Sequence, residues 1–150
     1  MALSTFKATA DLQSGMVVQA RSRQFEITID EPQELGGTDT GMNPVELVLC
    51  ALGACQAIVA RVYAPQFEIN LEAFRMELEG DIDIDGFLNK ADVRCGFKEV
   101  RYNIHIETDA SPEKVDKFID FIQTKCPVGD TIGAGSKLVL NKVILENAKV

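Results

Sequence analysis

Two of the four cysteines lie where a thiol could take part in chemistry. Cys55 occurs in the apolar stretch LGACQA, whose small glycine and alanine residues leave room for a substrate or another chain to approach the sulfur. Cys126 directly precedes Pro127, and proline suits the first position of a helix. A thiol at a helix N-terminus can be stabilised as a thiolate by the helix dipole, and Lys125 adds a nearby positive charge. Both positions are therefore candidates for thiol chemistry.

Structural explanations compete with this interpretation. A cysteine in an apolar helix is most often a small buried hydrophobe, and this is how we interpret Cys50. A reactive thiol and an incidental residue at a loop-to-helix junction remain comparable alternatives for Cys126. Cys95, in DVRCGF, falls in a strand pattern and is expected to be structural. Cys50 and Cys55 would lie roughly 140° apart around a helix, so we do not expect them to pair.

Other reactive combinations find little support in the sequence. There is no C-x-x-C pair, and the single histidine, His105, lies in a strand pattern far from either thiol, so we expect no metal or other cofactor. An arginine with a carboxylate is a more economical activating pair for a thiol than a Cys/His dyad. The acidic run at 79–86 lacks the rest of a calcium loop and is interpreted as a solvated strand end or hairpin tip.

Helices that could position the thiols are marked by caps and periodicity. Asn43 as N-cap and Pro44 at the first helical position predict a helix that runs to about residue 64, where Pro65 ends it. This helix is apolar nearly all round, so it is expected to be buried. Ser111 as cap predicts a second helix over 111–125, and a short helical turn is expected after Pro127.

The remaining sequence alternates with a period of two, which is typical of strands. Strand patterns occupy six segments: 5–12, 16–20, 24–31, 67–84, 91–108 and 136–147. The first three predict an antiparallel meander, and the next two predict long strands joined by a turn. No repeat or linker is present, so we expect a single α+β domain over residues 1–150.

Composition limits the classes of function. A net charge of −8 without a basic patch argues against binding to nucleic acid. We find no apolar run approaching the roughly 20 residues of a membrane span and no secretory signal pattern at the N-terminus. The expected location is the cytoplasm, where the cysteines would be mostly reduced thiols.

The segment DEPQELGGTDTGMNPVELVLCALGACQA, followed further along by KCPVGDTI, resembles the OsmC/Ohr family of osmotically inducible and organic-hydroperoxide-resistance proteins, in particular its OsmC-like branch. The resemblance implies antiparallel sheets packed around a long central helix, in an intertwined homodimer with active sites at the subunit interface. It also implies a thiol-dependent peroxidase that reduces organic hydroperoxides in oxidative-stress defence. The cysteine matching Cys55 would attack the peroxide, the one matching Cys126 would resolve the sulfenic acid as a disulfide, and a dithiol or lipoylated protein would reduce that disulfide, without a metal or prosthetic group.

The sequence departs from the family pattern at two points. In the better characterised peroxidases a glutamate directly follows the Asn-Pro pair and holds an arginine against the thiol, whereas this chain has Val45 there and Glu46 one place later, about 100° around the helix. Glu46 either acts with a different helix start or is a polar first-turn residue. The matching hairpin segment, DLQSGM, has no arginine, so Arg21 and Arg23 are the nearest candidates, with an ordinary charged turn as the alternative. A non-enzymatic OsmC-like protein that binds a small molecule or senses redox state is the second hypothesis.

Overall fold

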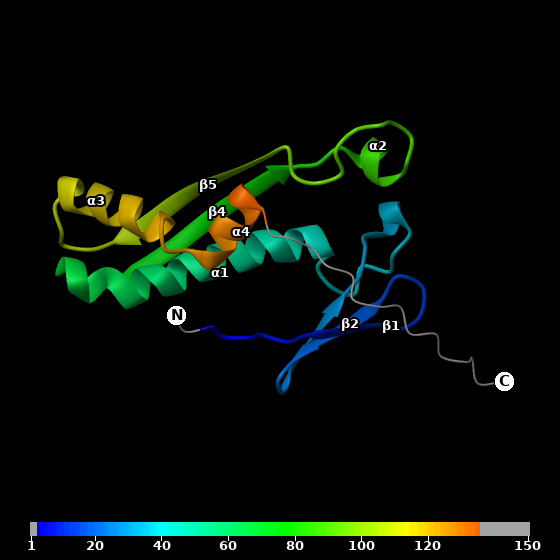
Figure 1. Cartoon of the computed structure of the whole chain (residues 1–150), viewed down its shortest axis with the longest axis horizontal. Helices are drawn as coiled ribbons and strands as arrows, with labels where there is room; N and C mark the ends of the chain where they lie inside the picture. Colours follow the sequence, from blue (N-terminus) through cyan, green and yellow to red (C-terminus); the bar gives the residue numbers. More distant parts are fainter. Residues whose placement is uncertain (1–2, 136–150) are drawn as a thin grey trace.

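The structure is a computed structural model and describes residues 3–135. It is an α+β fold, as predicted, in which a three-stranded sheet precedes a long helix and a strand pair with further helices (Figure 1). In chain order, with η for 3-10 helices, the elements are β1 (Thr9–Leu12), β2 (Val18–Ser22), β3 (Phe25–Ile29), η1 (Gln33–Leu35), α1 (Pro44–Tyr63), η2 (Ala64–Phe67), β4 (Ala73–Asp81), α2 (Ile84–Phe87), β5 (Glu99–Glu107), α3 (Pro112–Gln123) and α4 (Pro127–Ala134).

Helix α1 begins where its caps predict. The Asn43 side chain accepts a hydrogen bond from the Glu46 backbone N–H at 2.9 Å, and the Glu46 carboxylate accepts one from the Asn43 N–H at 2.9 Å. This reciprocal capping box satisfies two backbone donors that a helix start would otherwise leave free. The helix ends at Tyr63, and Pro65 lies in the following turn, so both predicted ends are confirmed.

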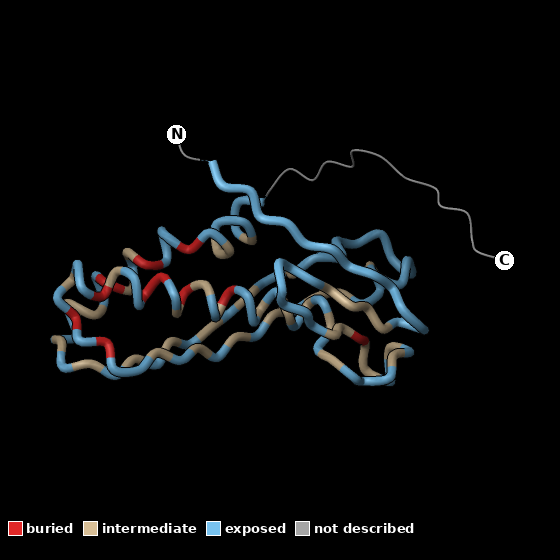
Figure 2. Tube along the Cα trace, turned by 90° about the horizontal axis from the view of Figure 1, so that it is seen from below, coloured by how far each residue is buried: buried red, intermediate tan, exposed pale blue. Residues whose placement is uncertain are grey.

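Burial of α1 is less complete than its composition predicts. Only four of its residues are buried: Leu52, Gln56, Val59 and Ala60. They form one face, which packs against α3, α4 and the β4–β5 pair, and the core continues through η2 and α3 (Figure 2). The expectation of an all-round buried helix is therefore wrong for the single chain, because the chain's own elements cover only one side of it.

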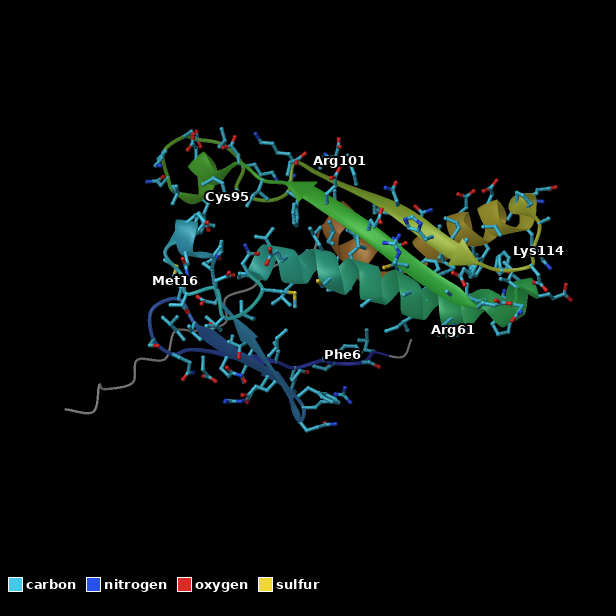
Figure 3. All side chains as sticks on the ribbon, turned by 180° about the vertical axis from the view of Figure 1, so that it is seen from behind. Phe6, Met16, Arg61, Cys95, Arg101 and Lys114 are labelled. Carbon is cyan, nitrogen blue, oxygen red and sulfur yellow. The ribbon has the colours of Figure 1, made fainter. Side chains whose placement is uncertain are left out.

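Strands β4 and β5 form an antiparallel pair that covers the length of α1 (Figure 1). Gly53 allows the close approach, since a Cβ at this position would lie 3.0 Å from the Leu78 side chain. Both strands alternate between half-buried and exposed residues, as expected for a pair with one solvated face. On that solvated face Arg101 pairs with three carboxylates, and its side chain points away from α1 (Figure 3).

The connection between β4 and β5 differs from the prediction. Of the two alternatives for the acidic run, the solvated strand end is correct, since β4 ends at Asp81, and the hairpin tip is wrong, since the Asp83 side chain caps α2 by accepting from the Asp85 N–H at 3.2 Å. This connection shortens the end of β4 and the start of β5 relative to their sequence patterns, and η2 with the loop that follows it shortens the start of β4. Cys95 lies in this connection and is exposed, not in a strand as expected (Figure 3). The closing strand predicted over 136–147 lies outside the described residues.

The N-terminal strands form the predicted antiparallel meander, with β2 in the middle. None of the residues in β1, β2 or β3 is buried. Figure 1 shows this sheet at the N-terminal end of α1, on the side away from β4 and β5. Leu12, Phe25 and Ile27 are exposed on it. Within the described chain, the sheet therefore has no hydrophobic core of its own.

Asp30 organises the loop that joins this sheet to α1. Its carboxylate is 1% exposed and accepts five hydrogen bonds, from the Glu31 N–H and from both the N–H and the hydroxyl of Thr38 and Thr40, at 2.6 to 3.2 Å. The Thr38 hydroxyl in particular holds the pKa of this carboxyl well below its usual range. Gly37 completes the loop, because a Cβ there would lie 1.8 Å from the Glu31 carbonyl oxygen.

The helical segment Pro44–Phe67 is long and apolar enough to span a membrane, with a mean hydropathy of 1.8 in its most apolar window. The expectation that no apolar run approaches this length is therefore wrong. Of that window, 22% is buried in the single chain. Length and composition alone do not separate a membrane span from a helix covered by protein.

Candidate active site

Cys55 and Cys126, far apart in the sequence, come together where α4 packs against α1. Cys126 is the N-cap of α4, as the position of Pro127 predicts, and its sulfur accepts a hydrogen bond from the Gly129 N–H at 3.3 Å. Cys55 lies close enough to influence the pKa of the Cys126 thiol. Cys126 is 1% exposed and Cys55 is half-buried. Within residues 3–135 the fold thus brings two free thiols close together, and Cys55 is the more accessible of the two.

The pKa of the Cys126 thiol is raised, chiefly by burial and then by its contact with Cys55. The Gly129 N–H acts in the opposite direction but does not outweigh these effects. The Lys125 ammonium lies over the Phe121 ring at 5.3 Å and is not among the groups that shift the pKa of Cys126. The predicted effect of the helix start is therefore present, since its backbone amides lower the pKa of Cys126, but tertiary burial of the thiol outweighs it.

Glu46 is held at the start of α1 by the capping box. It lies nine residues before Cys55, or roughly 13 Å along the helix axis. Its Oε2 atom is engaged by the Asn43 N–H, while no hydrogen bond to Oε1 occurs among residues 3–135. Within one chain, Glu46 and the thiol pair are separate features.

Arg21 and Arg23 both lie in the N-terminal sheet. Arg21, on β2, pairs with Glu26 and with Asp11, the latter at 3.4 Å. Arg23 lies in the turn between β2 and β3 at φ 55°, and its guanidinium covers the Phe25 ring at 4.9 Å. Neither side chain makes an ion pair or hydrogen bond with α1 or α4 in the described part of the chain.

The other soft or basic side chains lie elsewhere. Cys50 is exposed, so the expectation that it is a buried filler is wrong for the single chain, and its sulfur lies 3.7 Å from the Met42 sulfur. His105 lies on the solvated face of β5, 3.3 Å from Glu77. Among residues 3–135, no cluster of three or more histidine, cysteine or acidic side chains could hold a metal ion.

An apolar stripe on α1 runs past Cys55. Val48, Ala51, Ile58 and Val62 are exposed and recur, with Cys55 among them, at alternating spacings of three and four. Residues at this spacing share one face of a helix. The more accessible thiol of the pair therefore lies in the middle of an apolar face that the described chain leaves uncovered.

A family model for the OsmC-like protein matches residues 37–141. This chain belongs to the OsmC-like family. It is 29% identical over 137 residues to a hydroperoxide reductase of Mycoplasma pneumoniae, and the match covers 91% of this chain and 92% of that relative. A hydroperoxide reductase of Mycoplasma genitalium is 28% identical over the same number of residues, with the same coverage of both chains.

Solved structures agree with this assignment. The OsmC-like protein from Mycoplasma pneumoniae superposes with a TM-score of 0.76 at 28% identity, covering 86% of this chain and 87% of that one. An organic hydroperoxide resistance protein OsmC from Legionella pneumophila gives a TM-score of 0.68 at 24% identity, with 90% and 93% covered, and supports the fold alone. Both the OsmC resemblance and the fold class predicted from the sequence are confirmed.

One residue of this OsmC-like site was not singled out from the sequence. Gln56 follows Cys55 directly, is 3% exposed, and its Oε1 atom has no hydrogen-bond partner in the described chain. It lines a cavity of about 920 Å³ formed by α1, α4, the end of α3, β5 and the segment before β5. The sequence feature that could have identified Gln56 is its single amide side chain on the apolar helix face that also carries Leu52 and Val59.

Proposed function

We propose that this protein is a thiol-dependent peroxidase that reduces organic hydroperoxides to alcohols in oxidative-stress defence, with Cys55 as the peroxidatic and Cys126 as the resolving cysteine. The observation that carries the proposal is the proximity of these two thiols where α4 packs against α1, close enough for Cys55 to influence the pKa of Cys126. The hydroperoxide reductase names of the two mycoplasma relatives support the same reaction class.

The proposed cycle has three steps. The Cys55 thiolate attacks the terminal peroxide oxygen, the O–O bond breaks, and a proton converts the leaving alkoxide to an alcohol, which leaves a Cys55 sulfenic acid. The Cys126 sulfur then attacks the Cys55 sulfur, and water leaves as the disulfide forms. A dithiol, free or on a lipoylated protein, reduces the disulfide by two exchange steps and becomes a disulfide itself.

The difference in accessibility supports this division of roles. Cys55 is half-buried beside an open apolar face, where a hydroperoxide could approach it. Cys126 is enclosed, and its raised pKa keeps it protonated, so it is a poor first nucleophile at neutral pH. Because Cys55 and Cys126 are already close neighbours, resolution would need a local movement only once the sulfenic acid forms.

A homodimer would complete the site. We propose that the α1 stripe around Cys55 forms the subunit interface, so that a second copy of the chain covers the exposed side of this apolar helix. A second copy could then deliver Arg21 or Arg23 to the Cys55 thiolate. The Glu46 carboxylate, whose Oε1 accepts no hydrogen bond within residues 3–135, is the candidate group for orienting that arginine.

The deciding experiment follows the consumption of cumene hydroperoxide by the full-length protein in the presence of a dithiol. We expect turnover by the wild type and none by Cys55→Ser. In Cys126→Ser the Cys55 sulfenic acid cannot be resolved as the intramolecular disulfide, so we expect turnover to slow or to stop as Cys55 is over-oxidised. Cys50→Ser is the matched control, because Cys50 is an exposed thiol on the same helix. Equal turnover by Cys55→Ser and the wild type, or no turnover by any folded variant, would contradict the peroxidase proposal.

The second candidate function is a non-enzymatic protein that binds a small molecule, and the cavity at Gln56 is the observation that favours it. Under this alternative the protein would bind an organic ligand but consume no hydroperoxide. The activity assay above therefore separates the two functions.

A further inference from the structure

We infer that Cys50 and Met42, near the start of α1, form a binding site for a soft monovalent metal ion such as Cu⁺ or Ag⁺. The Cys50 thiolate and the Met42 thioether would be its two protein ligands. The site uses neither Cys55 nor Cys126, and the inference does not depend on the proposed peroxidase activity.

The two sulfur atoms converge on one point. The Cys50 thiol donates to the Met42 thioether, with 3.7 Å between the sulfurs. A metal ion that replaces the thiol proton would lie between them. With metal–sulfur bonds of about 2.3 Å, the observed separation gives an S–metal–S angle of roughly 110°. This angle leaves one side of the ion open for a further ligand, such as water or a small thiol.

Each ligand is anchored by a different part of the fold. Cys50 is fixed on α1, whereas Met42 belongs to the loop before it. The Asp30 N–H donates to the Met42 carbonyl at 3.3 Å, which ties this loop to the end of β3. Gly41 permits the close path, because a Cβ there would lie 2.3 Å from the Thr28 carbonyl oxygen. The backbone around both ligands is therefore set before a metal ion arrives, which lowers the entropy cost of binding.

The ligand types select the class of metal ion. Thiolate and thioether are soft donors, which favour Cu⁺ over hard ions such as Mg²⁺ or Ca²⁺. A structural zinc ion would need a larger ligand set, and residues 3–135 contain no cluster of three or more histidine, cysteine or acidic side chains. Ag⁺ has the same charge as Cu⁺ and is also soft, so it can serve as a probe of the same site.

The site is accessible and lies beside a negative charge. Cys50 is exposed, and Met42 is 43% exposed in the single chain. Glu46 precedes Cys50 by about one helical turn, so both side chains lie on the same face of α1. Its carboxylate favours a cation over a neutral molecule at this point. Binding exchanges the Cys50 proton for the metal ion and changes the oxidation state of neither.

The first test is an NMR titration of the reduced, full-length wild type with Ag⁺ in chloride-free buffer, with isotope-labelled methionine methyl groups. We expect the Met42 methyl signal to shift as Ag⁺ binds. The Met16 methyl group, which lies beside Gly36, is the internal reference and should keep its position. A Met42 signal that does not move after all the thiols have bound Ag⁺ would overturn the inference. This titration needs no variant.

The second test measures Cu⁺ affinity by competition with a chromogenic chelator under anaerobic, reducing conditions. One variant retains Cys50 as its single cysteine, through Cys55→Ser, Cys95→Ser and Cys126→Ser. The matched control retains Cys95 instead, which is exposed like Cys50 but lacks the thioether contact in the described chain. We expect the Cys50 variant to bind Cu⁺ about tenfold more tightly, because it offers a second soft ligand.

Adding Met42→Leu to the Cys50 variant should remove this advantage, since leucine keeps the volume of methionine but has no sulfur. Equal Cu⁺ affinities of the two single-cysteine variants, or an advantage that persists in Met42→Leu, would contradict the site. Neither test uses a peroxide. A protein without peroxidase activity can therefore still bind the metal ion, and an active peroxidase can fail to bind it.

Discussion

Truncation of Ile58 to alanine should weaken self-association if the α1 stripe is the subunit interface. Ile58 is 64% exposed in the single chain. Full burial of an isoleucine side chain contributes about 1.5–3 kcal/mol, so burying the exposed part contributes about 1–2 kcal/mol per copy. In a two-fold symmetric dimer each side chain counts twice, which gives about 2–4 kcal/mol and a dissociation constant raised roughly 30- to 1,000-fold.

Sedimentation equilibrium over a range of protein concentrations measures this dissociation constant directly. Phe87→Ala is the matched control, because Phe87 on α2 is 63% exposed and lies outside the stripe. We expect the control to leave the dissociation constant close to the wild-type value. Circular dichroism should show that both variants keep their helical content.

Two results would refute the reasoning about this interface. A wild-type protein that stays monomeric at tens of micromolar would mean that nothing covers the stripe in solution. A dimer that Phe87→Ala weakens as much as Ile58→Ala does would place the contact elsewhere, or spread it too widely for the stripe to define it.

Three further predictions concern stability and reactivity. The pKa of Asp30 is lower in the folded state than in the unfolded state, so its hydrogen bonds stabilise the fold above the usual carboxyl range near pH 4. This stabilisation is lost as the pH falls below that range. The urea midpoint measured from pH 5 to pH 2 should therefore fall more steeply for the wild type than for Asp30→Asn. Gly37→Ala should lower the melting temperature by roughly 5–10 °C, because the new methyl group would meet the Glu31 carbonyl at 1.8 Å, whereas Gly133→Ala, with nothing within 4 Å, should leave it unchanged or slightly raised. Burial and the raised pKa of Cys126 predict that iodoacetamide at pH 7 alkylates the two exposed cysteines well before Cys126, as mass spectrometry would show.

These three predictions have clear contrary outcomes. An identical dependence of the urea midpoint on pH for the wild type and Asp30→Asn would mean that the Asp30 carboxylate does not control stability in acid. An unchanged melting temperature in Gly37→Ala would show that the loop yields at little cost. Early alkylation of Cys126 would mean that the α1–α4 junction opens readily.

Features set by neighbouring residues could be predicted from the sequence. The start of α1 follows from Asn43 and Pro44, and the start of α3 from Ser111, since a cap acts within one turn. Phe118 and Ile122, four residues apart on α3 and therefore on one face of it, are both fully buried. Local sequence patterns of this kind predict most of the helices and strands that support the two thiols.

Features set by distant residues could not be predicted in this way. The raised pKa of Cys126 comes from burial under other elements and from Cys55, neither of which the sequence around Pro127 reveals. The exposed side of α1 depends on what the rest of the chain leaves uncovered. Pairing of the two thiols came from a family resemblance, because spacing along the chain gives no contact between such distant positions.

The hydrogen bonds around Asp30 also bear on how the N-terminal sheet can meet another molecule. A sheet without a core, joined to α1 by a freely rotating linker, would lose much orientational entropy on every encounter. Five hydrogen bonds and the tight packing at Gly37 instead fix the path of the linker when the chain folds. The N-terminal sheet therefore has a fixed orientation relative to α1 before any other molecule binds to it. A binding partner would not have to order the linker.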